Sequence, residues 1–319
     1  MLGSTSLRAV AEEEARQDAA AATGPSAEAV DPLVLAARSF VRLDYPAASL
    51  LFREEMETAR TGGERWCIAA YGLAMSLWHD TPPSSGATVE ARELLVRIEE
   101  NAEAPLHRDR SRLALARMAE LIDYPGDATD YDLARAYYRK LIEAEEAGEL
   151  VDEATLRLAV SLASEYRNPD SIEESVHLLR CRIEAGPDAE LLPLLWETLG
   201  IIMLERQGDR EGALLALSRA HELGFTNPTF APRISWTLAR LALEQGRFDL
   251  AVPVLEELVV KYPRSGRSYE ARRVLLRIAR EHPRLELRVP DLVEFKTPRA
   301  SEGSTGPAPD RVAAGGTEP

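Results

Sequence analysis

The chain has 319 residues, and its composition, 45% hydrophobic and 29% charged, is typical of a folded, soluble protein rather than a wholly disordered one. The formal net charge of −15 disfavours a nucleic-acid binder, because affinity for phosphates comes from clustered lysine and arginine. No window approaches the roughly 18 uninterrupted apolar residues that a membrane span requires, so we expect no membrane span.

Alanine, leucine, glutamate and arginine dominate the composition, and these residues lose little on entering a helix. Strand-like alternation is confined to Leu285 to Val289, directly before Pro290. The sequence therefore predicts an all-α fold.

Residues 1–30 are rich in Ala, Glu, Gly and Ser and show no sustained apolar stripe, which predicts a weakly ordered N-terminal arm. Glu12, Glu13 and Glu14 occupy the place where a secretory signal would carry its apolar run. We therefore expect a cytoplasmic protein. A signal sequence upstream of this start would instead make it periplasmic.

Residues 31–282 repeat a pattern in which a small residue is followed four positions later by a large apolar one, with steps of 43, 43, 41, 38 and 38 residues. The pairs are Ala48/Phe52, Ala91/Leu95, Ala134/Tyr138, Ser175/Leu179, Ala213/Leu217 and Ala251/Leu255. A period in this range is typical of a solenoid of stacked helix pairs. We predict a right-handed α-solenoid of about six helix-turn-helix repeats plus a terminal helix, in which these pairs are core positions.

The sixth repeat resembles the tetratricopeptide repeat family. It matches the family pattern without insertion at Leu238, Ala239, Ala242, Gly246, Phe248, Ala251, Leu255, Leu258 and Pro263. The fifth repeat is similar but has one extra residue, expected in the turn between its helices. Repeats two to four keep the second-helix pattern and have longer turns, for example His79 to Val89 and Asp123 to Asp130.

The run from Gly246 to Ala271 is also similar to repeats of bacterial envelope proteins of the Tol-Pal and outer-membrane-assembly type. This resemblance implies a bacterial origin. It also leaves an alternative function open, a structural or assembly factor of the cell envelope that self-associates.

The tetratricopeptide resemblance implies that the first helix of each pair lines a concave groove. The implied groove positions are Arg233, Trp236, Arg240 and Leu243 in repeat six, Arg273, Arg277 and Arg280 in the terminal helix, and Arg110, Leu113, Arg117 and Glu120 in repeat three. Since arginine suits carboxylates, the C-terminal arginines predict binding of an acidic or C-terminal peptide. Alternatively, Glu244, Glu270 and Glu281 neutralise these arginines as exposed pairs within their helices.

The groove positions of the first two repeats are apolar: Leu33, Phe40, Val41, Trp66, Leu73 and Leu77. An exposed apolar groove marks a partner-binding surface, a site for the chain's own arm, or a self-association face that would make the protein a homo-oligomer.

The sequence carries no pattern of an enzyme or of a cofactor or metal site. The five histidines are scattered, and there is no phosphate-binding loop or nucleophile elbow. Cys67 and Cys181 lie in apolar helical patterns and are interpreted as buried and unpaired.

Residues 283–299 are expected to be extended, and the Ser-, Gly- and Pro-rich residues 300–319 to form a disordered tail. Together these features predict a non-catalytic protein–protein interaction scaffold whose partner is a protein or peptide.

Overall fold

The computed structural model describes residues 30–82, 84–124, 126–144, 148–165, 168–285, 287 and 289–291. The predicted disordered tail and, apart from Val30, the predicted N-terminal arm lie outside the described residues.

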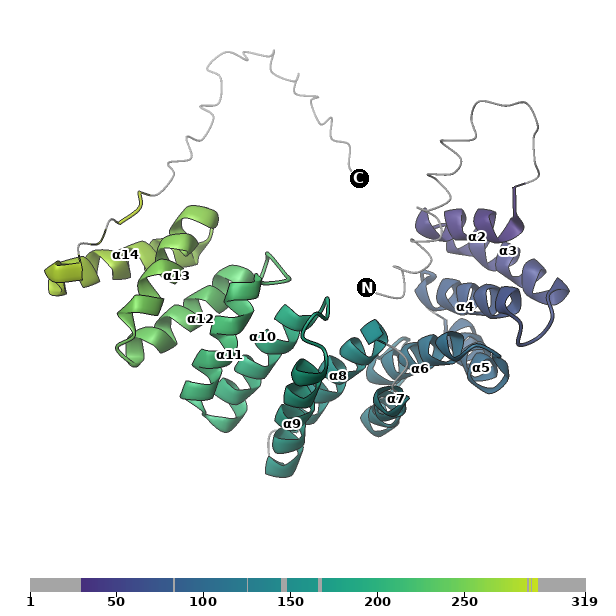
Figure 1. Cartoon of the computed structure of the whole chain (residues 1–319). Helices are drawn as coiled ribbons and strands as arrows, with labels where there is room; N and C mark the ends of the chain where they lie inside the picture. The colour runs from purple at the N-terminus through teal and green to yellow at the C-terminus, as the bar shows by residue number, and fades with distance from the viewer. Residues whose placement is uncertain are drawn as a thin grey trace, which may run out of the picture. The chain divides into compact units, whose positions relative to one another are not determined.

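The described residues form thirteen α-helices and contain no β-strand (Figure 1). They are α2 (Pro32–Val41), α3 (Tyr45–Thr58), α4 (Glu64–His79), α5 (Ser85–Asn101), α6 (Pro105–Glu120), α7 (Tyr131–Glu143), α8 (Gly148–Ala163), α9 (Pro169–Ala185), α10 (Leu192–Ile202), α11 (Arg210–Leu223), α12 (Ala231–Glu244), α13 (Phe248–Lys261) and α14 (Gly266–Glu281). Six consecutive pairs and the terminal α14 account for all of them. The predicted all-α helical-repeat fold is confirmed.

The chain divides into two compact units, residues 1–231 and residues 232–319. In the first unit each helix packs on the next, from α2 to α11. The first helices of successive pairs also contact one another, α2 with α4, α4 with α6, α6 with α8 and α8 with α10. The first helices thus form a continuous layer, as expected for helical repeats.

The repeating small and large residues all lie on the second helices of their pairs, and all twelve are fully buried. Two of the large residues, Phe52 and Leu217, pack against glycines of first helices. A Cβ at Gly72 would lie 2.5 Å from the ring of Phe52, and one at Gly200 would lie 2.7 Å from Leu217. The absence of a side chain at these two positions therefore lets the large residue pack directly against a first helix.

Side-chain caps define many of the helix starts, as the turn residues of the sequence imply. Asp31, Asp44, Ser84, Asp130, Asn168, Asp209 and Ser265 each accept a hydrogen bond from a backbone N–H of the helix that follows. Each cap satisfies a helical donor that would otherwise have no partner, and so sets where the helix begins.

The extra residue of the fifth repeat lies in the first helix rather than in the turn where the sequence placed it. Helix α10 continues as a π-helix, Met203–Gln207, which ends at Gly208 with a φ of 70°. A π-helical turn takes one more residue than an α-helical turn, so it absorbs the insertion without breaking the helix.

The long turn between α6 and α7 folds back on the preceding helices. Trp78 Nε1 on α4 donates to Asp123 over 2.9 Å, and Arg92 on α5 pairs with Asp123 and Asp127 at 3.2 and 2.9 Å. Asp130 then caps α7 by accepting from the N–H of Leu133. The bonds of Asp123 and Asp127 hold this turn against α4 and α5.

In the second unit α14 packs on α13, and Ser268 donates from its hydroxyl to the carbonyl of Leu258 over 2.9 Å. The predicted extended segment begins with a 3₁₀ turn, Pro283–Leu285. Arg272 on α14 then donates to the carbonyl of Pro290 over 3.0 Å and to Asp291 over 3.1 Å. The chain thus folds back along α14.

Candidate functional site: a groove on the first helices

Most of the apolar groove expected in the first two repeats is not open to solvent. Phe40, Trp66 and Leu73 are buried in one core cluster, and Leu33 and Leu77 are half-buried against it. The prediction of an exposed apolar groove is therefore wrong at these five positions, whereas Val41 is exposed. Helix α2 packs on α3, and α4 packs between α3 and α5, so neighbouring helices cover most of the apolar face that the sequence assigned to a partner.

The predicted C-terminal arginine site is only partly assembled. Arg233 and Arg240 are exposed on α12, and Arg240 lies 3.8 Å from Glu244, the pairing that the neutralisation alternative predicts. Trp236 and Leu243 are half-buried. The guanidinium of Arg267, at the start of α14, lies 5.7 Å from the centre of the Trp236 ring.

On α14 the buried face consists of Ser268, Ala271, Leu275 and Ile278. At about 100° per residue, Arg273, Arg277 and Arg280, spaced four and three residues apart, lie along one stripe of α14 on the side away from that face. All three arginines are exposed, and Arg280 Nε donates to the carbonyl of Leu276 in its own helix. The acidic-peptide site stays a prediction.

Glu120, one of the predicted groove positions of repeat three, lines a pocket of the first unit. This pocket of about 510 Å³ opens along α6, α8 and the segment leading into α10. Its lining consists of Glu120, Tyr131, Glu153, Leu156, Arg157, Val160, Ser161, Ser164, Leu191, Leu194 and Thr198. Tyr131 and Val160 are half exposed, at 50% and 55%. The pocket therefore offers apolar surface directly to solvent.

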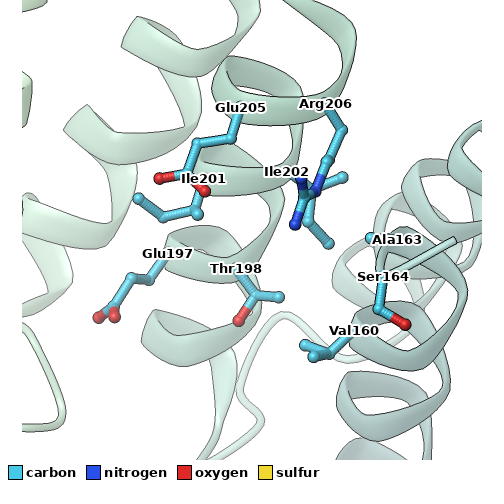
Figure 2. A pocket seen from close by; sticks show the side chains of 9 residues that line it. All are labelled: Val160, Ala163, Ser164, Glu197, Thr198, Ile201, Ile202, Glu205 and Arg206. Atoms are coloured by element: carbon cyan, nitrogen blue, oxygen red, sulfur yellow. The ribbon is translucent and has the colours of Figure 1, made fainter. Parts of the chain in front are cut away.

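A second pocket of about 310 Å³ adjoins the first and shares Val160, Ser164 and Thr198 with it. Figure 2 shows Val160 and Ala163 on α8, and Ser164 directly after it, across from Thr198, Ile202 and Arg206 on α10 and its π-helical end. Glu197, Ile201 and Glu205 lie on the other side of that helix. We call the two pockets together the central groove. It is lined mainly by first helices, as the family resemblance implied.

Two carboxylates of the central groove, those of Glu120 and Glu153, lie beside Arg117 and Arg157. Glu153 Oε1 accepts from Arg157 Nε over 3.2 Å and lies 3.7 Å from Arg117 Nη1. Glu153 Oε2 is buried and has no hydrogen-bond partner among the described residues. Glu120 lies 3.8 Å from Arg117 Nε, which is also buried without a hydrogen bond. Burial raises the pKa of both glutamates above the ordinary range.

Glu197 provides a pH test of this desolvation. Burial raises its pKa, and among the described residues it has neither a hydrogen bond nor an ion pair. Because the folded state then holds the proton more tightly than the unfolded state, stability falls as pH rises through the window between the two pKa values. We expect the melting temperature of Glu197→Gln minus that of the native chain to be larger at pH 7 than at pH 4.

Thermal melts followed by circular dichroism at the two pH values measure this effect. Glu173→Gln on the outer helix α9, an exposed glutamate, is the control and is expected to show no such pH dependence. A melting-temperature difference for Glu197→Gln that is the same at both pH values would contradict the effect.

Most of the groove was missed by sequence reasoning, although a signal was present. Arg117 and Glu120 were assigned to the groove, but Glu153, Val160 and Ser164 on α8 were not. Their spacings of seven and four residues place them along one helix face. Aligning the first helix of repeat four with the family pattern would have identified these residues as groove positions. The long turns of this repeat obscured that alignment.

Both cysteines are free. Cys67 is buried, as predicted, whereas Cys181 is exposed on α9, so the prediction of its burial is wrong. Among the described residues no group of three or more His, Cys, Asp or Glu side chains is placed to hold a metal ion. None of the described helices is long and apolar enough to cross a membrane.

The tetratricopeptide repeat family model matches residues 204–265 and 236–287. These residues carry tetratricopeptide repeats. The match begins in the π-helical end that follows α10 and covers α11, α12, α13 and α14. Tetratricopeptide arrays are quasi-linear stacks that present extended binding surfaces, which agrees with a protein-interaction role.

No curated protein matches the chain. Among solved structures it is similar to the assembly chaperone of RpL4 (Acl4), residues 1–338, at 19% sequence identity and a TM-score of 0.45, over 79% of this chain and 98% of that chain. None of these comparisons shows the similarity to Tol-Pal proteins or the bacterial origin inferred from repeat six.

Proposed function

We propose that this chain is a non-catalytic protein-interaction scaffold that holds a segment of a partner protein in the central groove. The observation that carries the proposal is the groove itself, a pair of adjoining pockets with half-exposed Tyr131 and Val160 at the face of the first helices. Apolar surface held open in a groove is a favourable site for a peptide segment, because the occupant removes it from water.

The layer of first helices supports the same role. Helix α8 contacts both α6 and α10, so the groove is framed mainly by packed helices. A preformed groove spares the protein the entropy of ordering its own side of the interface. The tetratricopeptide match over residues 204–287 places repeats of an interaction family next to it in the chain.

Site-specific photo-crosslinking tests the proposal. We expect benzoylphenylalanine at position 160 or 194 to crosslink to one segment of one partner in extracts of the native host. The matched control is position 215, where Leu215 is 63% exposed on the second helix α11 and is expected to give no such crosslink.

Mass spectrometry of the crosslinked peptides decides the outcome. Equal crosslinking from position 215, or none from positions 160 and 194, would overturn the scaffold proposal at this groove. Crosslinks that map to a second copy of this chain would replace it by self-association, the property that the envelope alternative requires.

A further inference from the structure

We propose that the segment held in the central groove carries an arginine or lysine whose cationic head binds the carboxylate of Glu153, with Glu120 as a second acceptor. This inference rests on the proposed function and specifies the chemistry of the occupant.

Glu153 presents an acceptor that the protein itself does not satisfy. Its side chain is only 9% exposed, it lines the larger pocket, and its Oε2 atom is buried without a hydrogen bond among the described residues. A buried carboxylate oxygen without a donor is unfavourable, because it has lost its water and gained no partner. An occupant that brings an N–H group to this oxygen removes that deficit.

The arginines near Glu153 do not fill this role. Arg157 and Arg117 both approach Oε1, at 3.2 and 3.7 Å, and leave Oε2 uncovered. Arg117 is shared between Glu153 and Glu120 at distances of 3.7 and 3.8 Å, which exceed those of normal hydrogen bonds. Arg117 therefore lies between two carboxylates without a normal hydrogen bond to either, and no arginine reaches Glu153 Oε2.

A cationic donor fits this arrangement better than a neutral one. Hydrogen bonds from a charged donor to a carboxylate are shorter and stronger than neutral ones, and they gain strength where water is excluded. Burial raises the pKa of Glu120 and Glu153, because desolvation disfavours the charged carboxylate. A cation from the partner would stabilise that charged form.

The apolar lining suits the remainder of the occupant. Leu156 is buried at the pocket, Val160 and Tyr131 are half exposed, and Leu191 and Leu194 are half-buried on the α10 side. Arginine and lysine carry a hydrocarbon stem that packs on such surface while the head group reaches a charge. The occupant is thus a short segment that combines a basic residue with apolar neighbours.

The probes are fluorescent peptides of about ten residues, a length that spans a groove of this kind. Each carries Leu at two fixed positions, Ala, Ser or Gly at the variable ones, and a central residue that is Arg, citrulline or Glu. Citrulline keeps the shape of arginine and removes its charge. We expect the tightest Arg peptides to bind the full chain about tenfold more tightly than their citrulline counterparts, and Glu peptides to bind most weakly.

Variants of the protein assign the effect to one carboxylate. We expect Glu153→Gln to weaken Arg peptides about tenfold and citrulline peptides less than about twofold, because only the charged pair is lost. Glu173→Gln on α9 is the matched control and should leave both affinities unchanged. Circular dichroism checks that each variant folds. If Glu153→Gln does not fold, Glu120→Gln is the second variant, and we expect it to weaken Arg-peptide binding by a smaller factor.

Three outcomes would overturn the proposal of a cationic occupant. They are equal binding of Arg and citrulline peptides, binding that does not respond to Glu153→Gln and Glu120→Gln, and no binding of any Arg peptide. These outcomes are distinguishable from failure of the scaffold itself. Crosslinking from position 160 to a segment without Arg or Lys would overturn this inference alone, whereas absence of crosslinking at positions 160 and 194 would overturn the proposed function.

Discussion

Phe52→Ala is expected to lower the free energy of unfolding of the first unit by about 3–5 kcal/mol, the range for removing a fully buried aromatic side chain. The Phe52 side chain on α3 is fully buried, and its ring packs where Gly72 on α4 has no side chain. Truncation leaves a cavity between α3 and α4 that the neighbouring helices can close only in part.

Denaturant unfolding of the full chain, followed by circular dichroism, measures the loss, and hydrogen exchange locates it in α3 and α4. Leu50→Ala on the same helix is the control, because Leu50 is 66% exposed and should change stability by no more than about 0.5 kcal/mol. A loss of less than about 1 kcal/mol for Phe52→Ala would show that the junction between these repeats is not tightly packed.

Gly72→Ala provides a second test of the same junction. Its Cβ would lie 2.5 Å from the Phe52 ring, so the single variant should be destabilised by about 1–3 kcal/mol through overpacking. In the Phe52→Ala background the clash is absent, and the added methyl partly fills the cavity. We therefore expect a smaller loss from Gly72→Ala there than in the native chain.

Arg135→Ala is expected to lower the free energy of unfolding by about 2–3 kcal/mol, the scale of losing charge-assisted hydrogen bonds at a buried site. Arg135 on α7 is 8% exposed, and it donates from Nε to Ser161 Oγ and from Nη2 to the Ser161 carbonyl, both over 2.9 Å. It also pairs with Glu165 just beyond α8. The side chain joins α7 to the helix that forms one wall of the central groove.

The pH dependence of this variant has a definite sign. Hydrogen bonds from Ser171, Arg135 and Asn168 lower the pKa of Glu165 from 4.5 to about 2. A lowered pKa stabilises the fold above the usual value of the group, and that contribution is lost as pH falls towards 2. The difference in stability between the native chain and Arg135→Ala should therefore shrink as pH falls from about 5 to 2.

Denaturant unfolding at several pH values checks both parts of this prediction. Arg139→Ala, on the same helix, is the matched control. Arg139 forms an exposed pair with Glu174 at 2.8 Å and should contribute no more than about 1 kcal/mol. Equal losses for the two arginine variants would contradict a bracing role for Arg135.

The sequence by itself determined the helices and the core residues that hold each pair together. Ala48 and Phe52, Ala134 and Tyr138, and their counterparts in the other repeats were identified from spacing alone, and all are fully buried. This was possible because helical periodicity and the small-to-large step are local properties, repeated six times and readable without knowledge of neighbours. The family resemblance of residues 204–287 was detectable for the same reason.

The tertiary structure alone decided which apolar and charged positions stay accessible. Phe40, Trp66 and Leu73 were indistinguishable in sequence from groove residues, yet neighbouring helices bury them, whereas Val160 is left open between α8 and α10. The orphaned oxygen of Glu153 depends on where Arg117 and Arg157 reach from α6 and α8. Exposure and charge neutralisation are set by residues far apart in the chain, so periodicity cannot report them.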